Sequence, residues 1–197
     1  MLKEHEVNRL NNFIMGWYAD DTTFCDELIE LHRKSDSKQI NGAGVDVKES
    51  TDVPLSLNQP SSYWETFVRC WGLYFNKYPA AKMNCGMTMK QFAVIQHYPI
   101  GGGYKVWHHE RGDSKQPYVS RHLVFMTYLN DVPDGGTEFI CQNLKIKAER
   151  GLTLIWPADW MFTHKGEISF NLEKWIITGW INLKDENENS NLFGRPS

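Results

Sequence analysis

From Gln91 onward the chain is a succession of short β-rich runs separated by turns that carry glycine or proline, and this feature constrains the fold most strongly. The runs are FAVIQHY, YKVWHHE, HLVFMTYLN, TEFI, NLKIK, LTLIW, MFTH and KWIITGWINL. No helical pattern lies between them, which excludes a parallel sheet built from alternating strands and helices. About eight short antiparallel strands predict a double-stranded β-helix, the jelly-roll or cupin-like double sheet.

The glycine-bearing segments between these runs predict turns. We interpret Gly101–Gly103 as a hairpin turn rather than a phosphate-binding loop, because no helix follows the glycines. The dipeptide Asp134-Gly135 is interpreted as a turn in the same way.

Two helices are predicted before the β-rich part. A capping box at Thr23–Asp26 is followed by apolar residues at helical spacing, and we expect a helix from about Thr23 to Lys34. A second capping box, Ser62–Glu65, begins a helix that should stop at Pro79. Its aromatic stripe is expected to pack against a sheet rather than to bind a cofactor, and comprises Trp64, Phe67, Val68, Trp71, Tyr74, Phe75 and Tyr78.

The length of 197 residues and an apolar content of 41% are sufficient for one domain with a sizeable core. We expect a mainly β protein with N-terminal helices, an α+β arrangement. Residues 1–90 would form a helical support, residues 91–183 the β-helix core, and residues 184–197 a flexible tail.

Charge and cysteine content exclude several classes of function. The net charge of −3 comes without a basic stripe or polybasic segment, so we expect neither nucleic acid nor an anionic membrane as partner. The longest apolar runs fall short of the roughly 18 residues that span a bilayer, and MLKEHEVNRL has no signal-peptide character. Four cysteines without a CxxC pair are interpreted as reduced thiols. These features predict a cytoplasmic protein.

The run YKVWHHERGD places two histidines beside two carboxylates. In a strand, side chains i and i+2 point to the same face, so His108 and Glu110 share a face and His109 points away. His109 with Asp113 is a competing pair, but Gly112 indicates that the strand has already ended there. An imidazole and a carboxylate on one face can occupy adjacent positions around a metal.

A metal site needs a third ligand elsewhere in the chain. His164, which closes the predicted strand WMFTH more than fifty residues after His108, is the best candidate. Two histidines and one carboxylate leave positions open around non-haem iron(II) for a chelating cosubstrate and oxygen. A zinc hydrolase also uses an open site, but the chain lacks an H-E-x-x-H helix or a comparable general-base motif.

Lys174 lies ten residues after His164, inside the apolar run KWIITGWI. By alternation it shares a face with Ile176, Thr178 and Trp180, and an ammonium group that points into a barrel is costly without an anionic partner. Lys174 therefore either receives the distal carboxylate of a bound dicarboxylic acid, or extends from a strand edge into solvent.

With these residues in place, the chain resembles the Fe(II)/2-oxoglutarate-dependent dioxygenases, in the prolyl-4-hydroxylase-like branch of viral and bacterial type. The resemblance covers about residues 91–183 and is carried by YPIGGGYKVWHHE, RHLVFMTYLND, DGGTEF, GLTLIWP and an H-x9-K spacing with WI after the lysine. Two features depart from the family. Glutamate stands at position 110 where the family usually has aspartate, and one extra residue separates Tyr104 from His108.

The resemblance implies a role for each matching residue. The implied iron ligands and catalytic residues are His108, Glu110 and His164. The implied residues for 2-oxoglutarate are Lys174, Tyr98 and Tyr128, which would hold its 5-carboxylate. The implied cofactors are Fe(II) and 2-oxoglutarate, with ascorbate as a further candidate, and the implied reactant is molecular oxygen.

The resemblance also implies a hydroxylase that acts on prolyl residues in a peptide or protein. The loop ERGDSKQPYVS is short and polar, which favours an open face suited to an extended peptide. Two alternatives stay open: a non-catalytic double-stranded β-helix protein that binds a metal or ligand, and the same oxygenase chemistry on a small metabolite. Trp107, Trp156 and Trp180 are candidates for the walls of the site or for the core.

Overall fold

The computed structural model describes residues 2–40, 44–57, 60–83, 86–89, 93–112 and 115–184. Within these ranges nine strands form one large sheet whose neighbouring strands are antiparallel. In spatial order they are β1 (Lys3–Glu4), β2 (Met15–Tyr18), β12 (Leu152–Pro157), β9 (Arg121–Tyr128), β14 (Lys174–Leu183), β7 (Ala93–Tyr98), β5 (Thr51–Leu55) and β3 (Gln39–Ile40), with β6 (Met87–Thr88) paired to β14.

Two smaller sheets complete the β structure. One has the order β11 (Leu144–Ala148), β10 (Val132–Phe139), β13 (His164–Gly166), and the other pairs β4 (Lys48–Glu49) with β8 (Gly103–Tyr104). Four short 3-10 helices occur among the described residues: η1 (Glu6–Arg9), η2 (Pro79–Lys82), η3 (Tyr118–Ser120) and η4 (Trp160–Phe162). The predicted fold class, mainly β with a jelly-roll core and two helices, is confirmed.

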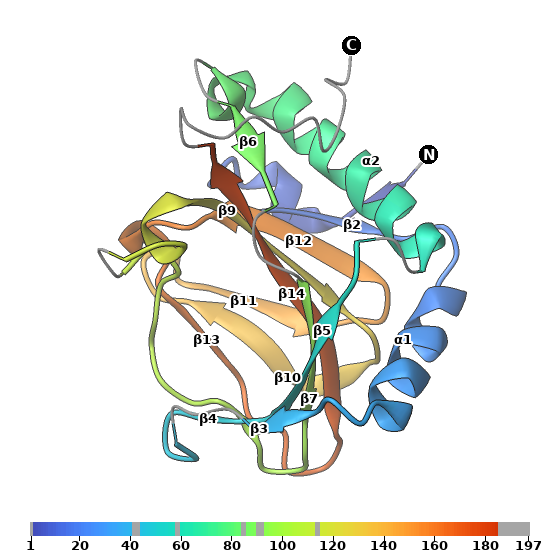
Figure 1. The fold of residues 1–197 in the computed structure, drawn as a ribbon. Helices are drawn as coiled ribbons and strands as arrows, with labels where there is room; N and C mark the ends of the chain where they lie inside the picture. Colours follow the sequence, from blue (N-terminus) through green and yellow to red (C-terminus); the bar gives the residue numbers. More distant parts are fainter. Residues whose placement is uncertain are drawn as a thin grey trace.

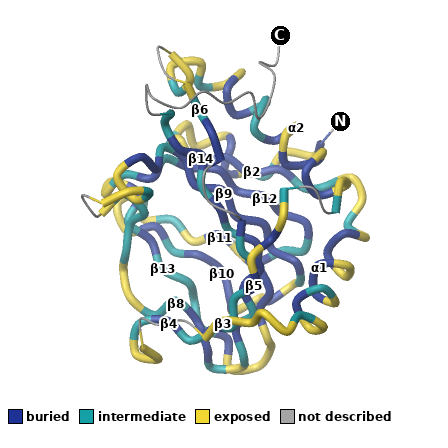
Figure 2. The backbone as a smooth tube through the Cα atoms, in the orientation of Figure 1, coloured by how far each residue is buried: buried dark blue, intermediate teal, exposed yellow. Residues whose placement is uncertain are grey.

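Helices α1 (Thr23–Lys34) and α2 (Ser61–Lys77) lie along one side of the large sheet, and β10, β11 and β13 lie on the other side (Figure 1). The alternation along β14 produces these two layers. Trp175, Ile177 and Ile181 pack into the core under the helices. Ile176 packs into a second core between the sheets, together with residues of β9, β10, β11 and β12. Figure 2 shows the buried strands between an outer layer of exposed helix faces and loops.

The predicted helix bounds are confirmed, but the predicted capping boxes are wrong. The residues that precede the helices are Thr22 and Pro60, and neither makes a side-chain capping hydrogen bond. The amide of Thr23 instead donates to the Asp21 carboxylate at 2.9 Å. Of the aromatic stripe of α2, Trp64, Phe67, Tyr74 and Phe75 are buried, Trp71 and Tyr78 are partly buried against the same core, and Val68 is 45% exposed.

The N-terminal part is more than a helical support. Its strand β2 pairs with β12, and β5 pairs with β7 in the large sheet. The sequence did not reveal these strands because runs of two to five residues are too short to show a two-residue period. They become strands by pairing with longer neighbours.

The predicted turn at Asp134-Gly135 is wrong, because the PDGG segment lies inside strand β10. The register of β10 against β11 shifts between Val132 and Thr137, as at a β-bulge. A Cβ atom at Gly136 would lie 2.2 Å from the carbonyl oxygen of Ile146. The glycine thus permits a close approach of two backbones rather than a reversal of the chain.

Three further predictions of local structure need correction. The run YKVWHHE is a strand only at Tyr104, the end of β8, and it is otherwise irregular up to an isolated bridge at His108. His164 begins β13 instead of closing a strand, because Trp160–Phe162 form the 3-10 helix η4. Gly101–Gly103 do turn the chain, with Gly101 at φ +80°, but β8 pairs with β4, so the turn closes no hairpin with β7.

Of the helices in the described ranges, none combines the length and apolar character that crossing a membrane requires. Cys25, Cys70 and Cys141 are free thiols, as expected, and Cys85 lies outside the described residues. The predicted tail also lies outside them from residue 185 onward.

Candidate active site

A backbone pairing brings His108 and His164 together although they are far apart in the chain. The amide of His108 donates to the carbonyl of His164 at 3.0 Å, and the amide of His164 donates to the carbonyl of His108 at 2.8 Å. This reciprocal bridge is the antiparallel pattern that sets two residues directly opposite each other. Their imidazole centroids lie 4.4 Å apart.

Each imidazole is held with one particular nitrogen facing the other groups of the site. The Nδ1 atom of His108 lies 3.1 Å from the Val106 carbonyl oxygen, and the Nδ1 atom of His164 lies 2.8 Å from that of Phe162. A carbonyl oxygen can only accept, so the proton of each neutral ring is on Nδ1. The Nε2 lone pairs are therefore free to bind a metal.

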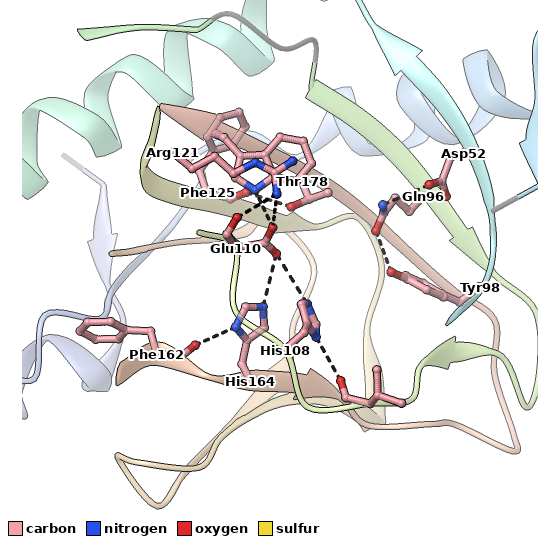
Figure 3. A network of polar contacts seen from close by, with 12 residues as sticks. Asp52, Gln96, Tyr98, His108, Glu110, Arg121, Phe125, Phe162, His164 and Thr178 are labelled. Carbon is pink, nitrogen blue, oxygen red and sulfur yellow. Dashed lines mark hydrogen bonds and ion pairs between the residues drawn. The ribbon is translucent and has the colours of Figure 1, made fainter. Parts of the chain in front are cut away.

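Glu110 directs one carboxylate oxygen at these two nitrogens (Figure 3). Its Oε1 atom lies 3.6 Å from Nε2 of His108 and 3.8 Å from Nε2 of His164. One ligand atom from each residue lies within 4.8 Å of the others, as around a common metal position. The other oxygen, Oε2, accepts hydrogen bonds from Arg121 at 2.7 Å and Trp180 at 2.9 Å.

The protonation states in this cluster suit metal binding. Burial raises the pKa of Glu110, but the polar contact with His108 and the charges of His108, His164 and Arg121 outweigh it and lower the pKa to about 2. Burial, followed by the charge of His108, lowers the pKa of His164 to about 4. Near neutral pH Glu110 is thus ionised and His164 is neutral, as metal ligands must be.

The donor set fits iron(II). Two imidazole nitrogens and one carboxylate oxygen converge from one side, which leaves the remaining coordination positions toward the cavity. His109, the neighbour excluded by alternation, does not belong to this cluster, and its ring lies beside Gly112 instead. Asp113, its proposed companion, lies outside the described residues.

The triad lines a cavity of about 570 Å³ between the large sheet and the smaller sheets. The predicted alternation along β14 is observed, because the cavity is lined by Lys174, Ile176, Thr178 and Trp180. Of the three candidate tryptophans, Trp156 and Trp180 line this cavity. Trp107 is 41% exposed and lies under the ammonium of Lys165 at 4.7 Å.

Lys174 is buried in the cavity wall. Its Nζ atom donates to the carbonyl oxygens of Gly135 at 2.7 Å and Glu167 at 2.8 Å. Among the described residues, no carboxylate forms an ion pair with it. Burial lowers the pKa of Lys174 to about 8, although the charges of Glu167 and Asp134 act in the opposite direction. The solvent-exposed alternative for this lysine is wrong, because its side chain is 5% exposed.

Tyr98 and Tyr128, the other residues expected to hold 2-oxoglutarate, also line the cavity. The hydroxyl of Tyr98 donates to Gln96 at 2.6 Å, so its proton is engaged within the protein. Gln96 in turn donates to Asp52 at 3.3 Å. The hydroxyl of Tyr128 shares a 2.6 Å hydrogen bond with Thr137. Two hydroxyls share this one hydrogen bond, so one of their two protons is left to donate to a further acceptor, whereas the Tyr98 proton is already used.

Sequence reasoning missed Arg121 as a partner of Glu110. Alternation along β9 would place Arg121 with Leu123 and Phe125, which pack under the helices. The register of β9 against β14 shifts between Ile181 and Asn182, and Asn182 is the residue paired with Arg121. The side chain consequently lines the cavity. The only signal in the sequence was a basic residue at the start of an apolar strand.

Comparison with known proteins agrees with this geometry. The family model of the 2OG-Fe(II) oxygenase superfamily matches residues 93–182. No curated protein sequence matches the chain.

Three solved structures share the fold. The viral collagen prolyl hydroxylase of Paramecium Bursaria Chlorella virus-1, in its 2OG complex, matches with TM-score 0.68 and 17% identity over 87% of this chain and 96% of that one. A Pseudomonas putida prolyl-4-hydroxylase matches with TM-score 0.67 and 13% identity over 91% and 97%. A Trichoplax adhaerens prolyl hydroxylase, in complex with a hypoxia inducible factor peptide fragment, matches with TM-score 0.70 and 15% identity over 89% and 86%.

The residues that form the triad and the buried lysine all fall inside the matched segment. Residues 93–182, which hold the triad and the lysine, are therefore the segment of the chain that matches the 2OG-Fe(II) oxygenase superfamily.

Proposed function

We propose that the chain is an Fe(II)- and 2-oxoglutarate-dependent hydroxylase of prolyl residues in a peptide or protein. The observation that carries the proposal is one cavity that holds both the convergent atoms of His108, Glu110 and His164 and the buried ammonium of Lys174. The first group suits a divalent metal and the second suits a carboxylate. Together they match a metal centre whose cosubstrate is an acid.

Each residue would have a distinct task. His108, Glu110 and His164 would hold the iron, and Lys174 would donate a charge-assisted hydrogen bond to the distal carboxylate of 2-oxoglutarate. When bound, iron and 2-oxoglutarate supply the oxidising chemistry, in which oxygen is consumed and the cosubstrate becomes succinate and carbon dioxide. Ile176, Met126 and Trp156 would exclude water, because their apolar side chains line the same cavity.

A peptide substrate is supported by the surroundings of the cavity and by one structural relative. Tyr118 lines the cavity and is 41% exposed, so an aromatic side chain is available at the rim to an incoming chain. The Trichoplax adhaerens relative was solved with a peptide. All three relatives described above are prolyl hydroxylases, which makes a prolyl residue the first substrate to test.

The test is a proline-containing peptide library incubated with Fe(II) and 2-oxoglutarate and analysed by mass spectrometry. We expect succinate formation above the rate without peptide, and a mass gain of about 16 in the peptide, the mass of one oxygen atom. Free amino acids, nucleosides and fatty acids are tested in parallel. Stimulation by one of these alone would reject the peptide substrate and leave the oxygenase chemistry intact. No succinate with any substrate would favour the non-catalytic alternative.

A pH dependence follows from the lowered pKa of Lys174. A lysine with a pKa of about 8 loses its charge more than two units below its ordinary value of 10.5, so its hold on a carboxylate weakens as pH rises through 8. We expect kcat/KM for 2-oxoglutarate to fall roughly tenfold per pH unit above that value. Steady-state kinetics between about pH 7 and about pH 9.5 measures this. Lys174→Arg is the control, because arginine stays charged over this range. An equal fall in both proteins would assign the titration to another group.

A further inference from the structure

Two hydrogen bonds hold Oε2 of Glu110, the carboxylate oxygen that does not face the histidines. Arg121 and Trp180 both donate to Oε2, at 2.7 Å and 2.9 Å, while Oε1 faces the two histidines. Two donors on one oxygen fix the rotation of the carboxylate plane. They also leave one oxygen of the carboxylate directed at the metal position.

Arg121 is itself held on three sides. Its Nη1 atom also donates to the backbone carbonyl of Glu110 at 3.2 Å, so Arg121 contacts both the backbone and the carboxylate of Glu110. The guanidinium carbon lies 3.6 Å from the centroid of the Trp180 ring and 4.5 Å from that of Tyr118. A guanidinium between two aromatic rings is well placed to keep a fixed orientation.

The support from Arg121 and Trp180 matters because the side chain of Glu110 is longer than that of aspartate. Glutamate has one more rotatable bond than aspartate, so an unsupported Glu110 would hold its oxygens less firmly. It could also present both oxygens to the metal and occupy two positions. Arg121 and Trp180, which together form a clamp on Oε2, restrict the rotation of the carboxylate and keep Oε2 from binding the metal. They do so because both donate hydrogen bonds to Oε2.

We propose that Arg121 and Trp180 are positioning residues that make Glu110 a ligand through Oε1 alone. The proposal rests on the metal centre of the proposed function. The clamp keeps the longer acid compatible with a site that must leave positions open for other ligands. Arg121 Nη1 and the Trp180 indole nitrogen both donate to Oε2, the oxygen that does not face the two histidines.

The test measures metal affinity rather than turnover, with Co(II) as a spectroscopic substitute for Fe(II) in the full-length protein. Trp180→Phe removes the indole N–H and keeps an aromatic ring against Arg121. We expect Co(II) affinity to fall about tenfold, at the lower end of the 10- to 100-fold that supporting residues of metal ligands contribute. The visible Co(II) spectrum should also change, because the carboxylate is then free to rotate.

The chain offers a matched control in Trp156. This tryptophan lines the same cavity and packs edge-on against His164 at 5.1 Å. Its indole nitrogen makes no hydrogen bond to any described residue. Trp156→Phe therefore makes the same chemical change without touching Glu110, and we expect Co(II) affinity to fall clearly less than in Trp180→Phe.

A double-mutant cycle with Glu110→Asp separates positioning from stability. Aspartate is too short to reach both the clamp and the metal, so the single variant should bind Co(II) more weakly. In the Trp180→Phe background the same replacement should cost several-fold less, because the clamp is already weakened. If Trp180 only stabilised the fold, Trp180→Phe would lower the melting temperature. The effects of Trp180→Phe and Glu110→Asp on Co(II) affinity would then be independent of each other.

The outcomes distinguish a failure of the positioning role from a failure of the metal centre. If the wild type binds Co(II) and Trp180→Phe behaves like Trp156→Phe, the clamp has no positioning role. If the wild type binds neither Co(II) nor Fe(II), the metal centre of the proposed function is wrong. Arg121→Lys, which keeps the charge and loses the planar fork, should weaken Co(II) binding at least as much as Trp180→Phe. An unchanged affinity in that variant would also overturn the proposal.

Discussion

Alanine at His108, Glu110 or His164 is expected to abolish measurable iron binding and 2-oxoglutarate turnover. The three ligand atoms lie within 4.8 Å of one another, so each contributes a bond that the other two cannot replace. The loss should exceed the roughly 10- to 100-fold that removal of a supporting residue costs. Anaerobic Fe(II) titration, followed by the weak visible band that appears with 2-oxoglutarate, measures the effect.

His109→Ala is the matched control for this experiment. The residue is adjacent to His108 and identical to it in chemistry, but it lies outside the cluster that could hold a metal. We expect it to keep both iron and turnover. Equal loss of iron in His109→Ala and His108→Ala would show that the wrong histidine has been assigned.

The second large effect is expected at Lys174. Lys174→Met keeps most of the side-chain volume and removes the ammonium group, and the 2-oxoglutarate requirement should rise sharply. A hydrogen bond to a charged group contributes about 1.5–3 kcal/mol, or roughly ten- to hundredfold in affinity. Iron affinity should stay nearly unchanged, because the Lys174 ammonium contacts Gly135, Glu167 and the Tyr98 ring rather than the triad. The KM for 2-oxoglutarate and the Fe(II) affinity are measured side by side.

Tyr98→Phe gives the comparison for this prediction. The Tyr98 hydroxyl donates to Gln96, so its loss should raise the 2-oxoglutarate requirement much less than the loss of the Lys174 ammonium. An equal rise in both variants would show that the Tyr98 proton turns to the cosubstrate. An unchanged requirement in Lys174→Met would place the carboxylate site elsewhere.

Local pattern predicted the long elements well and the short ones poorly. The run KWIITGWINL became β14 with the predicted bounds, and α1 spans the predicted residues. Ten residues of alternation, or three helical turns, carry enough periodicity to identify an element. The short strands β2 and β5 carry none, and their conformation depends on the strands beside them.

Glycine shows the same limit in another way. The sequence PDGG has the composition of a turn, yet Gly135 and Gly136 lie in strand β10. Their missing side chains allow close approach to Val132 and to the backbone of Ile146. The carbonyl of Gly135 also accepts a hydrogen bond from Lys174. The sequence shows that these positions have no side chain, but only the packed structure shows which neighbouring atoms leave no room for one.

The sequence by itself determined which groups enter the cavity from β14, because alternation along one strand is a local property. It also paired Glu110 with His108, although the segment that carries them is not a regular strand. Tertiary structure decided that His164 lies opposite His108, since a backbone bridge between distant segments joins them. It also decided that Arg121 holds Glu110, through a register shift between β9 and β14. Register is fixed by pairing between strands distant in sequence, and no period within either strand encodes it.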